Sequence, residues 1–351
     1  MDYSFKNEIK FDDHVIGSEQ PCFVIAEIGI NHNGDLDTAK RLIDAAVSAG
    51  ANAVKFQKRD LKSIYPSEIL ETPSLDSQGT EILIDVLQQV EFQEDDFKEI
   101  IDYCKKKQIT FLCTPWDSPS VDFLEKLNVS GYKVASADMT NFPLIKYLSQ
   151  TKKPLIVSTG MSTMDEIEKT VNFIKQQNVP FLLLHCNSTY PSAPEMLNLN
   201  LIPVLQKKFD VPVGYSGHES DIIPSITAAN LGSVLIERHI TLDKTMEGLD
   251  QSASLEPEEF KKLIEFIRLS EKAKGSPIKT MTRGETLQRE VLGKSIICST
   301  DIKKDEIFSE KNIQVKTPAR GISPQYYYDL IGKKSPRDIK KNEYIQLDDV
   351  Q

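Results

Sequence analysis

The chain has 351 residues and a formal net charge of −10, and 40% of its residues are hydrophobic, which is ordinary usage for a globular protein. An acidic chain without a clustered basic face is not expected to bind nucleic acid, and a chain without about 18 consecutive apolar residues is not expected to span a membrane. The first residues lack the basic start and apolar core of a secretory signal, which predicts a cytoplasmic protein.

Short apolar runs alternate with amphipathic stretches from residue 23 to residue 241. This alternation predicts repeated βα units around a parallel sheet, with helices after the runs, for example at residues 37–49 and 257–270. Eight such units in about 280 residues predict a (β/α)8 TIM barrel. The runs predicted to be strands are residues 23–29, 53–57, 110–115, 132–136, 154–160, 180–186, 211–217 and 233–241.

A doubly wound open sheet is the competing fold, and it predicts a Gly-x-Gly-x-x-Gly turn after the first strand. The first turn here reads Ile-Gly-Ile-Asn-His-Asn-Gly at residues 28–34. This turn does not match the dinucleotide fingerprint. The barrel is therefore the favoured fold.

The βα rhythm stops after residue 277, and short strand-like runs separated by turns follow, beginning near Val291. Residues 301–313 are similar to residues 338–350, at an offset of 37 positions. Two copies predict a small pseudo-symmetric unit, because stacked repeat proteins need about three or more repeats. The sequence therefore predicts a barrel domain at residues 1–282 and a small β-rich domain at residues 283–351, linker included.

The five cysteines are scattered and form no Cys-x-x-Cys pair. Their odd number predicts reduced, buried thiols rather than a disulfide framework or a zinc site. These cysteines are Cys22, Cys104, Cys113, Cys186 and Cys298.

The active site of a TIM barrel lies at the C-terminal ends of its strands, so polar residues that close an apolar run are the first candidates. Side chains two positions apart on a strand point the same way. This rule pairs residue 55 with 57, 216 with 218, and 237 with 239. The residues that the strand ends select are Glu27, Lys55, Gln57, Lys133, Ser136, Ser158, Ser216, His218, Glu237 and His239.

His218 and His239 close consecutive strands, which places two imidazoles on neighbouring rungs of the barrel rim. Two protein ligands leave several coordination positions open, which suits Mn²⁺ or Mg²⁺. Such an ion would act as a Lewis acid toward a substrate oxygen. The competing interpretation is that each histidine is a solvated or hydrogen-bonded residue at a strand end.

Lys55 and Lys133 are expected inside the barrel mouth, where an ammonium must be compensated or have a lowered pKa. An anionic substrate would compensate them, and a phosphate would also find serine hydroxyls and the backbone amides of residues 158–161. Two alternatives stay open. The lysines pair with barrel carboxylates such as Glu27 or Glu237, or one lysine forms a Schiff base as in barrel aldolases.

Three further features are interpreted as structural. The basic residues after the second strand are expected in a solvated loop rather than in a phosphate clamp, and Trp116 is expected to pack rather than to stack on a sugar. His185 is expected to have a role in the core, although it lies near the end of the sixth strand. The basic residues are Lys58, Arg59 and Lys62.

Seven segments, in order along the chain, resemble the sialic acid synthase family. They include Gly-Tyr-Ser-Gly-His at residues 214–218 and Glu-Arg-His-Ile-Thr-Leu-Asp at residues 237–243. The resemblance extends over nearly the whole chain, and residues 292–297 and 321–324 resemble the family's antifreeze-like (SAF) domain. The seven segments are residues 26–35, 54–57, 132–136, 158–161, 214–218, 237–243 and 252–257.

The resemblance implies a condensation of phosphoenolpyruvate (PEP) with an N-acylated mannosamine-type sugar, free or as the 6-phosphate. The products would be a sialic-acid-like nonulosonic acid and phosphate. A diamino-dideoxy hexose, as used for legionaminic or pseudaminic acid, is the alternative acceptor. A glycan-binding protein without activity is the alternative outside the enzymes.

The resemblance also assigns roles within the site. Glu27, Glu237 and Lys133 would be catalytic, with the glutamates steering the attacking water and its proton. The sugar would contact Gln57, Tyr190 and Asp250. The residues implied to hold PEP are Lys55, Lys133, Ser136, Ser158, Ser188 and Ser216.

In many family members the SAF domain offers an arginine, within a Lys-Arg-Pro segment, to the sugar bound by the other subunit. A domain-swapped homodimer is implied. This chain has Lys-Thr-Pro at residues 316–318 instead. Arg320 lies nearby and is the expected substitute.

Overall fold

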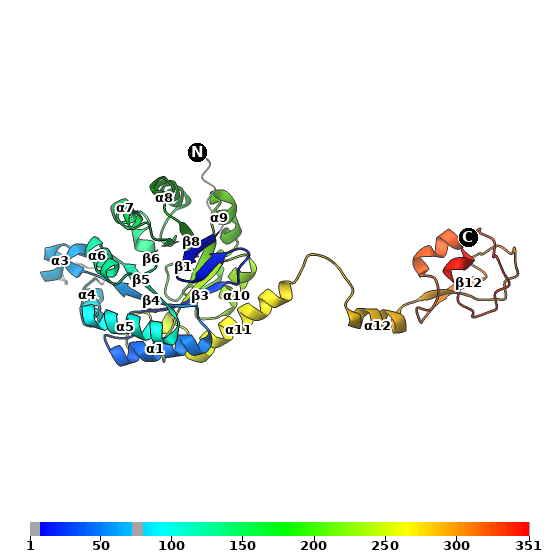
Figure 1. The fold of residues 1–351 in the computed structure, drawn as a ribbon, viewed down its shortest axis with the longest axis horizontal. Helices are drawn as coiled ribbons and strands as arrows, with labels where there is room; N and C mark the ends of the chain where they lie inside the picture. The colour runs from blue at the N-terminus through cyan, green and yellow to red at the C-terminus, as the bar shows by residue number, and fades with distance from the viewer. Residues whose placement is uncertain (1–7, 72–79, 351) are drawn as a thin grey trace. The chain divides into compact units, whose positions relative to one another are not determined.

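The computed structural model describes residues 8–71 and 80–350, and the chain divides into two compact units, Met1–Gly275 and Ser276–Gln351 (Figure 1). The division falls a few residues before the boundary predicted after residue 282. Across these two described ranges, no helix is both long enough and apolar enough to cross a membrane.

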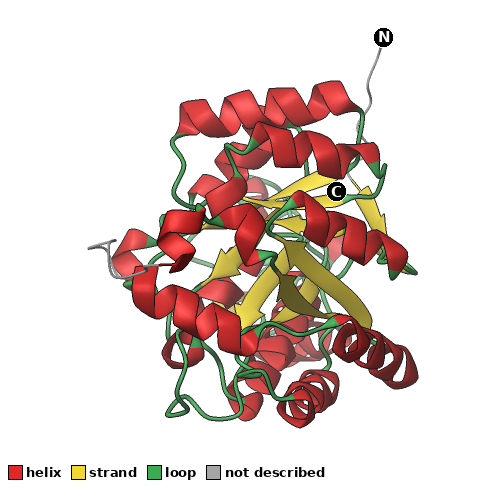
Figure 2. Ribbon diagram, turned by 90° about the vertical axis from the view of Figure 1, so that its left-hand side faces the viewer, coloured by secondary structure: helices red, strands yellow, loops and turns green. Residues whose placement is uncertain are grey.

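Eight parallel strands of the first unit close into a barrel, in the order β10, β3, β4, β5, β6, β7, β8, β9. Figure 2 shows these strands in yellow at the centre, with red helices around them. The architecture is the (β/α)8 barrel that the alternation of the sequence predicts. The strands are β3 (Phe23–Gly29), β4 (Ala53–Lys58), β5 (Thr110–Pro115), β6 (Tyr132–Val134), β7 (Leu155–Ser158), β8 (Phe181–Cys186), β9 (Val213–Gly217) and β10 (Leu235–His239).

The barrel helices begin where the sequence supplies caps. Asp35 accepts a hydrogen bond at the start of α1 (Leu36–Ala49), and Thr163 and Glu166 form a capping box at the start of α8 (Met164–Gln177). The apolar faces of the helices and the outer faces of the strands form the main core. The remaining helices of this unit are α2 (Leu61–Ile64), α3 (Ser67–Glu71), α4 (Thr80–Val90), α5 (Glu94–Lys107), α6 (Ser118–Lys126), α7 (Phe142–Gln150), α9 (Leu201–Phe209), α10 (Ile223–Asn230) and α11 (Pro257–Lys274).

A β-hairpin that the sequence analysis did not predict precedes the barrel. Its strands, β1 (Glu8–Phe11) and β2 (His14–Gly17), pair antiparallel. The ring of Phe11 packs against Gly131, just before β6 begins, and the hairpin shares one apolar cluster with the inward residues of the barrel strands. The hairpin therefore closes the N-terminal end of the barrel, and the C-terminal end is left for a site.

The second unit has an apolar core of its own. It contains α12 (Arg283–Leu292), the antiparallel strands β11 (Ser295–Cys298) and β12 (Ile313–Lys316), and α13 (Tyr327–Leu330). The strand-like runs predicted from about Val291 begin with β11, and the helix α12 that precedes them was not predicted.

The two copies of the internal repeat contact each other reciprocally. Asp338 accepts a hydrogen bond from the backbone amide of Lys304 at 2.9 Å, and Asp301 accepts one from the amide of Lys341 at 2.8 Å. Each aspartate thus orders the turn of the other copy. This arrangement confirms the pseudo-symmetric unit that the repeat predicts.

The five cysteines are free and buried, as their number and spacing predict. Burial raises the pKa of Cys104 to about 12, and it also raises the pKa of Cys22 to about 12. These two thiols stay protonated at neutral pH, which is the state of structural cysteines.

Candidate active site

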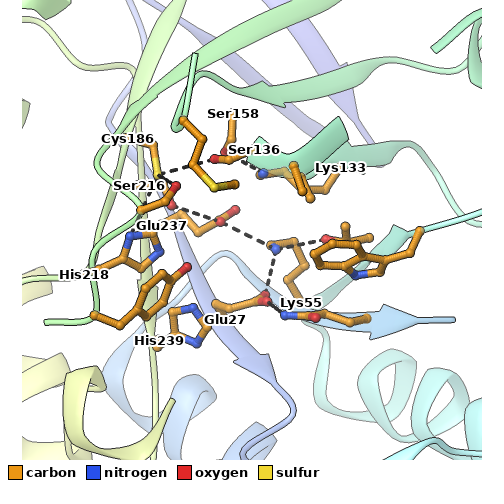
Figure 3. Close-up of a pocket in the computed structure, with 18 residues that line it drawn as sticks. Glu27, Lys55, Lys133, Ser136, Ser158, Cys186, Ser216, His218, Glu237 and His239 are labelled. Carbon is orange, nitrogen blue, oxygen red and sulfur yellow. Dashed lines mark hydrogen bonds and ion pairs between the residues drawn. The ribbon is translucent and has the colours of Figure 1, made fainter. Parts of the chain in front are cut away.

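A pocket of about 260 Å³ opens at the C-terminal ends of the barrel strands. Figure 3 shows its side chains converging, with Lys133, Ser136 and Ser158 across the pocket from the two histidines. Twelve of the fourteen predicted site residues line it. These twelve are Glu27, Lys55, Gln57, Lys133, Ser136, Ser158, Ser188, Tyr190, Ser216, His218, Glu237 and His239.

Lys55 joins two buried carboxylates in the pocket. Its Nζ lies 2.9 Å from Oε2 of Glu27 and 3.5 Å from Oε1 of Glu237. Burial alone would lower the pKa of Lys55, but the carboxylates of Glu237 and Glu27 raise it. Burial opposes ionisation of Glu237, yet Lys55 and then Lys133 outweigh it and lower the pKa of this carboxyl. For Lys55, the alternative of pairing with barrel carboxylates is therefore confirmed.

Hydrogen bonds fix the orientation of both carboxylates. Gln57 donates from Nε2 to Oε1 of Glu27 at 2.9 Å, and Ser216 donates to Oε1 of Glu237 at 3.2 Å. Within the described ranges, Oε2 of Glu237 is buried and has no hydrogen-bond partner. An unpartnered buried carboxylate oxygen is a place where a water or a substrate hydroxyl gains a hydrogen bond.

Lys133 is buried without a carboxylate partner. Its Nζ donates to the hydroxyl of Ser158 at 2.5 Å and to the carbonyl of Val134 at 2.9 Å, and no ion pair involves it in the part of the chain that the structure describes. Burial lowers the pKa of Lys133 from 10.5 to about 8. A buried ammonium that is paired with neutral groups alone favours the approach of an anion.

Three serine hydroxyls gather beside Lys133 around Gly160. β6 ends at Val134, two residues earlier than predicted, and a 3₁₀ turn carries Ser136 into the pocket. A Cβ atom at Gly160 would overlap the hydroxyls of Ser188 and Ser136. The glycine therefore leaves a small space lined by hydroxyl groups, and Ser158 adds the third through Lys133. Such a space suits phosphate or carboxylate oxygens.

The two histidines lie side by side, with ring centres 5.6 Å apart. Nδ1 of His218 lies 2.7 Å from the carbonyl oxygen of Asn187, which only accepts, so Nδ1 carries the proton and Nε2 keeps its lone pair. Burial, and then the neighbouring His239, lowers the pKa of His218 to about 3, so this ring is neutral. Nδ1 of His239 is buried without a hydrogen-bond partner in the described ranges.

This donor set fits a divalent cation that keeps open coordination positions. Neutral imidazole nitrogens are good ligands for divalent ions, and the backbone carbonyl that holds Nδ1 of His218 is the outer contact usual for a ligating histidine. In the described ranges no group of three or more His, Cys, Asp or Glu side chains is arranged to hold a metal ion. His218 and His239 would therefore be the protein's two ligands.

Asp250 and Arg320 are the predicted residues outside the pocket lining. Oδ2 of Asp250 lies 3.8 Å from Nδ1 of His239, so it stands beside the histidine pair. Arg320 belongs to the second unit, and its role in the site stays a prediction. Tyr190, predicted from the family resemblance alone, packs against His218 with ring centres 3.9 Å apart and the rings tilted by 31°.

Six lining residues were not predicted to belong to the site: Ala135, Ala137 and Met161, and the three described next. Thr114 accepts a hydrogen bond from Nζ of Lys55 at 3.1 Å, and Cys186 lies among the serines, 3.7 Å from the hydroxyl of Ser136. Trp116, which was expected to pack rather than to stack on a sugar, packs against the guanidinium of Arg59 and also lines the pocket. The strand-end rule would have found Thr114 and Trp116, because both lie at the end of β5.

The interpretation of the basic loop after β4 was wrong for two of its three residues. Nζ of Lys58 lies 2.5 Å from the carboxylate of Glu91, and the side chain of Arg59 is buried. Lys62 is exposed, as expected. His185 has the predicted core role, since its Nε2 bonds the carbonyl of Leu197 at 2.7 Å.

A parallel barrel that gathers paired carboxylates, lysines, serines and histidines at its C-terminal rim is the architecture of an enzyme active site. The sequence model of the NeuB family matches residues 42–279, and that of the SAF domain matches residues 293–351. The chain therefore belongs to the NeuB family. The resemblance predicted from its motifs is confirmed, as is the SAF domain.

Relatives of known name span almost the whole chain. The N-acetylneuraminate-9-phosphate synthase of Homo sapiens is 40% identical over 334 residues, which cover 94% of this chain and 93% of that protein. The N,N'-diacetyllegionaminic acid synthase of Campylobacter jejuni is 40% identical over 330 residues, which cover 92% and 98%. The crystal structure of the N-acetylneuraminic acid synthetase from Leptospira borgpetersenii, in complex with citrate, matches with a TM-score of 0.71 and 34% identity over 80% of this chain and 94% of that one.

Proposed function

We propose that this protein condenses PEP with an N-acyl mannosamine-type sugar to form a nonulosonic acid and phosphate. The relatives named as N-acetylneuraminate-9-phosphate and legionaminic acid synthases support this reaction. One observation carries the proposal. The same pocket contains an ammonium without a carboxylate partner, at Lys133, and two buried carboxylates that pair with Lys55. The first group suits an anionic substrate, and the second suits proton transfer.

The half of the pocket around Lys133 would bind PEP. A PEP phosphate or carboxylate placed there would accept hydrogen bonds from Nζ of Lys133 and from the hydroxyls of Ser136 and Ser188. Charge-assisted hydrogen bonds of this kind are about twice as strong as neutral ones. Ser158, which now receives a hydrogen bond from Lys133, would keep the ammonium directed at the anion.

Carbon and oxygen bonds change in a fixed order in this reaction. C3 of PEP attacks the aldehyde carbon of the open-chain sugar and forms the new C–C bond. Water then adds to the electron-poor C2, and the adduct collapses with cleavage of the C–O bond to phosphate. One proton of the water goes to the sugar oxygen, and the hydroxyl left at C2 gives the second proton to the departing phosphate as the keto group forms.

Glu237 is the better placed of the two glutamates to take the proton from water. Within the described ranges, Oε2 of Glu237 has neither a hydrogen bond nor an ion pair, whereas Glu27 accepts a hydrogen bond from Gln57 at Oε1 and pairs with Lys55 at Oε2. The lowered pKa of Glu237 keeps it ionised and able to accept a hydrogen bond. Glu27 would hold Lys55 and Gln57 in place.

Mn²⁺ or Mg²⁺ would be held by His218, whose Nε2 keeps its lone pair, and by His239, whose Nδ1 has no hydrogen-bond partner in the described ranges. When bound, such an ion polarises the aldehyde of the acceptor and stabilises the negative charge that develops on its oxygen. Gln57, Tyr190 and Asp250 would contact the rest of the sugar. A diamino-dideoxy hexose is the alternative acceptor, supported by the legionaminic acid synthase relative.

The assembly of the active protein is also a proposal. We infer a domain-swapped homodimer in which Arg320 reaches the acceptor sugar of the other subunit, as the family resemblance implies. Five unpaired cysteines favour the cytoplasm as the location. Arg320→Ala in the full chain should raise the KM for the sugar and leave the KM for PEP unchanged. A monomer in solution would contradict the swapped arrangement.

A phosphate-release assay with a panel of acceptors tests the proposed reaction. N-acetylmannosamine, its 6-phosphate and a diamino-dideoxy hexose would each be incubated with PEP, with and without Mn²⁺. We expect phosphate release that requires both one of these acceptors and the metal ion. Release from PEP without dependence on an acceptor, or no release with any acceptor, would contradict the proposal.

A Schiff-base aldolase is the second candidate, because the pKa of Lys133, about 8, leaves part of this amine unprotonated at neutral pH. Borohydride in the presence of a keto acid would trap an aldolase adduct on lysine. We expect no adduct by mass spectrometry and a complete loss of activity on chelation. Trapping at Lys133 would favour the aldolase instead.

A further inference from the structure

Arg59 is a buried cation that the proposed reaction leaves unused. The residue is 8% exposed, and its guanidinium carbon lies 4.3 Å from the centre of the Trp116 ring. In the described part of the chain, no carboxylate forms an ion pair with it, and Nη1 is buried without a hydrogen-bond partner. Burial lowers the pKa of Arg59, although the carboxylates of Glu91 and Asp250 oppose this effect. A buried guanidinium without a counter-ion is costly, as for Lys133.

The backbone around Arg59 is fixed rather than free to move into solvent. Oε1 of Glu91 accepts a hydrogen bond from the amide of Arg59 at 3.1 Å, and it also pairs with Lys58 at 2.5 Å. Oδ2 of Asp117 accepts one from the amide of Asp60 at 2.7 Å. Two carboxylates thus hold consecutive amides of this loop. The guanidinium is therefore held in place before any ligand binds.

Arg59 lies behind the active-site pocket, in contact with two residues that line it. It donates from Nη2 to Oε1 of Gln57, and both Gln57 and Trp116 line the pocket. On its other side, Arg59 lines a neighbouring cavity of about 560 Å³ together with Lys58 and Lys62. Lys58 is neutralised by Glu91, so Arg59 and the exposed Lys62 are the cations of this cavity that are left for a ligand.

We propose that Arg59 binds a phosphate ester carried by the acceptor sugar at the end remote from its aldehyde. This inference rests on the proposed function, since it names which acceptor the site takes. A guanidinium placed over an indole ring offers its N–H groups in the planar fork that matches phosphate oxygens. Nη1 would donate to the ester, and Lys62 would approach it from solvent.

The anion that Arg59 would bind has one source among the two substrates of the reaction. The carboxylate and phosphate of PEP are assigned to the Lys133 side of the pocket, which lies across from Glu27 in Figure 3. Arg59 lies on the Glu27 side, because it bonds Gln57, which in turn bonds Glu27. An N-acyl mannosamine has no anionic group of its own. A phosphorylated acceptor supplies one.

Steady-state kinetics with two acceptors tests the proposal. For the full-length protein, kcat/KM is measured with N-acetylmannosamine 6-phosphate and with N-acetylmannosamine, at saturating PEP and Mn²⁺. We expect Arg59→Gln to lower the ratio of the two values by about 30- to 100-fold, the effect of one to two charge-assisted hydrogen bonds. Arg59→Lys should lower it less. Lys105→Gln, which removes an exposed charge on α5, is the control and should leave the ratio unchanged.

Binding can be followed without turnover, because Trp116 is the single tryptophan of the chain. In the absence of PEP, N-acetylmannosamine 6-phosphate should change the fluorescence of Trp116 in the wild type and should not in Arg59→Gln. N-acetylmannosamine should give similar responses in both proteins.

The outcomes separate the inference from the function that it rests on. A ratio unchanged in Arg59→Gln, with both acceptors slowed equally, would assign Arg59 to the positioning of Gln57 and overturn the phosphate site. Turnover of the unphosphorylated sugar or of a diamino-dideoxy hexose alone would also overturn it, while the synthase function would stand. Absence of turnover with every acceptor would contradict the function itself.

Discussion

The two sides of the active-site pocket differ in how a buried lysine is compensated. On the side of β3, β4 and β10, Lys55 lies within ion-pair distance of Glu27 and Glu237. On the side of β6 and β7, Lys133 has a hydroxyl and a carbonyl as its partners. The first lysine is electrostatically complete without substrate, and the second is not. The comparison indicates which lysine organises the protein and which one receives the substrate.

The difference also fits the chemistry that each side is proposed to perform. Carboxylates that transfer protons need fixed positions, and Lys55 supplies them with a permanent counter-charge. An anion site must be empty and charged before its ligand arrives, which requires a cation that the protein leaves unpaired. Arg59 is likewise a buried cation without an ion-pair partner in the described ranges, and we propose that it binds the far end of the acceptor.

The largest effect is expected from removal of a histidine. His218→Ala should lose divalent metal in a titration and should lower kcat by about 1,000-fold or more, because the aldehyde would no longer be polarised. His14→Ala, a histidine of the N-terminal hairpin, is the matched control. Full turnover of His218→Ala in buffer that contains a chelator would contradict a role for the metal ion in the reaction.

The second prediction separates the two substrates at Lys133. Lys133→Met should lower kcat/KM for PEP by about 100- to 1,000-fold, the loss of a charged hydrogen-bonding partner, with little change in the KM for the sugar. Initial rates measured over both concentrations give the two constants. A larger change in the sugar constant would place the anion site elsewhere.

The two lysines should respond oppositely in stability. Lys55→Met leaves Glu27 and Glu237 buried without their partner and should lower the free energy of unfolding by about 3–5 kcal/mol. Lys133→Met removes a buried charge whose pKa is lowered from 10.5 to about 8, and it should raise the stability of the ligand-free protein by up to about 3 kcal/mol. Urea unfolding at pH 7 measures both. Destabilisation of similar size in both variants would contradict the conclusion that Lys55 is compensated by carboxylates and Lys133 is not.

The fourth prediction concerns pH. Lys133 is protonated below its pKa of about 8 and neutral above it, so kcat/KM for PEP should fall about tenfold per pH unit above pH 8. In stability the sign is reversed. The unfolded chain binds the proton up to about pH 10.5, so the unfolding free energy of the wild type rises relative to that of Lys133→Met between pH 8 and pH 10. A flat PEP profile across this range would argue against a role for the ammonium.

Much of the fold and of the site could be predicted from the sequence, because both follow from local rules. The alternation of apolar runs fixed the eight strands, and the two-residue period placed Lys55, Glu237 and His239 facing inward. The β1–β2 hairpin was missed, because four-residue strands leave little periodicity to detect.

What could not be predicted depends on contacts between distant segments. Whether a lysine is paired is decided by strands that meet only in the closed barrel, as Lys55 does with Glu237 of β10. The loop of Lys58 and Arg59 looked solvated, because its buried state depends on Glu91, more than thirty residues away along the chain. Arg320 belongs to the second unit, and its role in the site stays a prediction.

Calorimetry of PEP binding tests whether Lys133 is a buried cation whose ion-pair partner is the bound PEP. At pH 8.5 most of this amine is neutral, and an anion that raises its pKa makes the protein take up about three-quarters of a proton. Binding heats measured in two buffers with different ionisation enthalpies give that number. We expect this uptake in the wild type and none in Lys133→Met. Equal heats in both buffers for the wild type, or the same uptake in the variant, would contradict it.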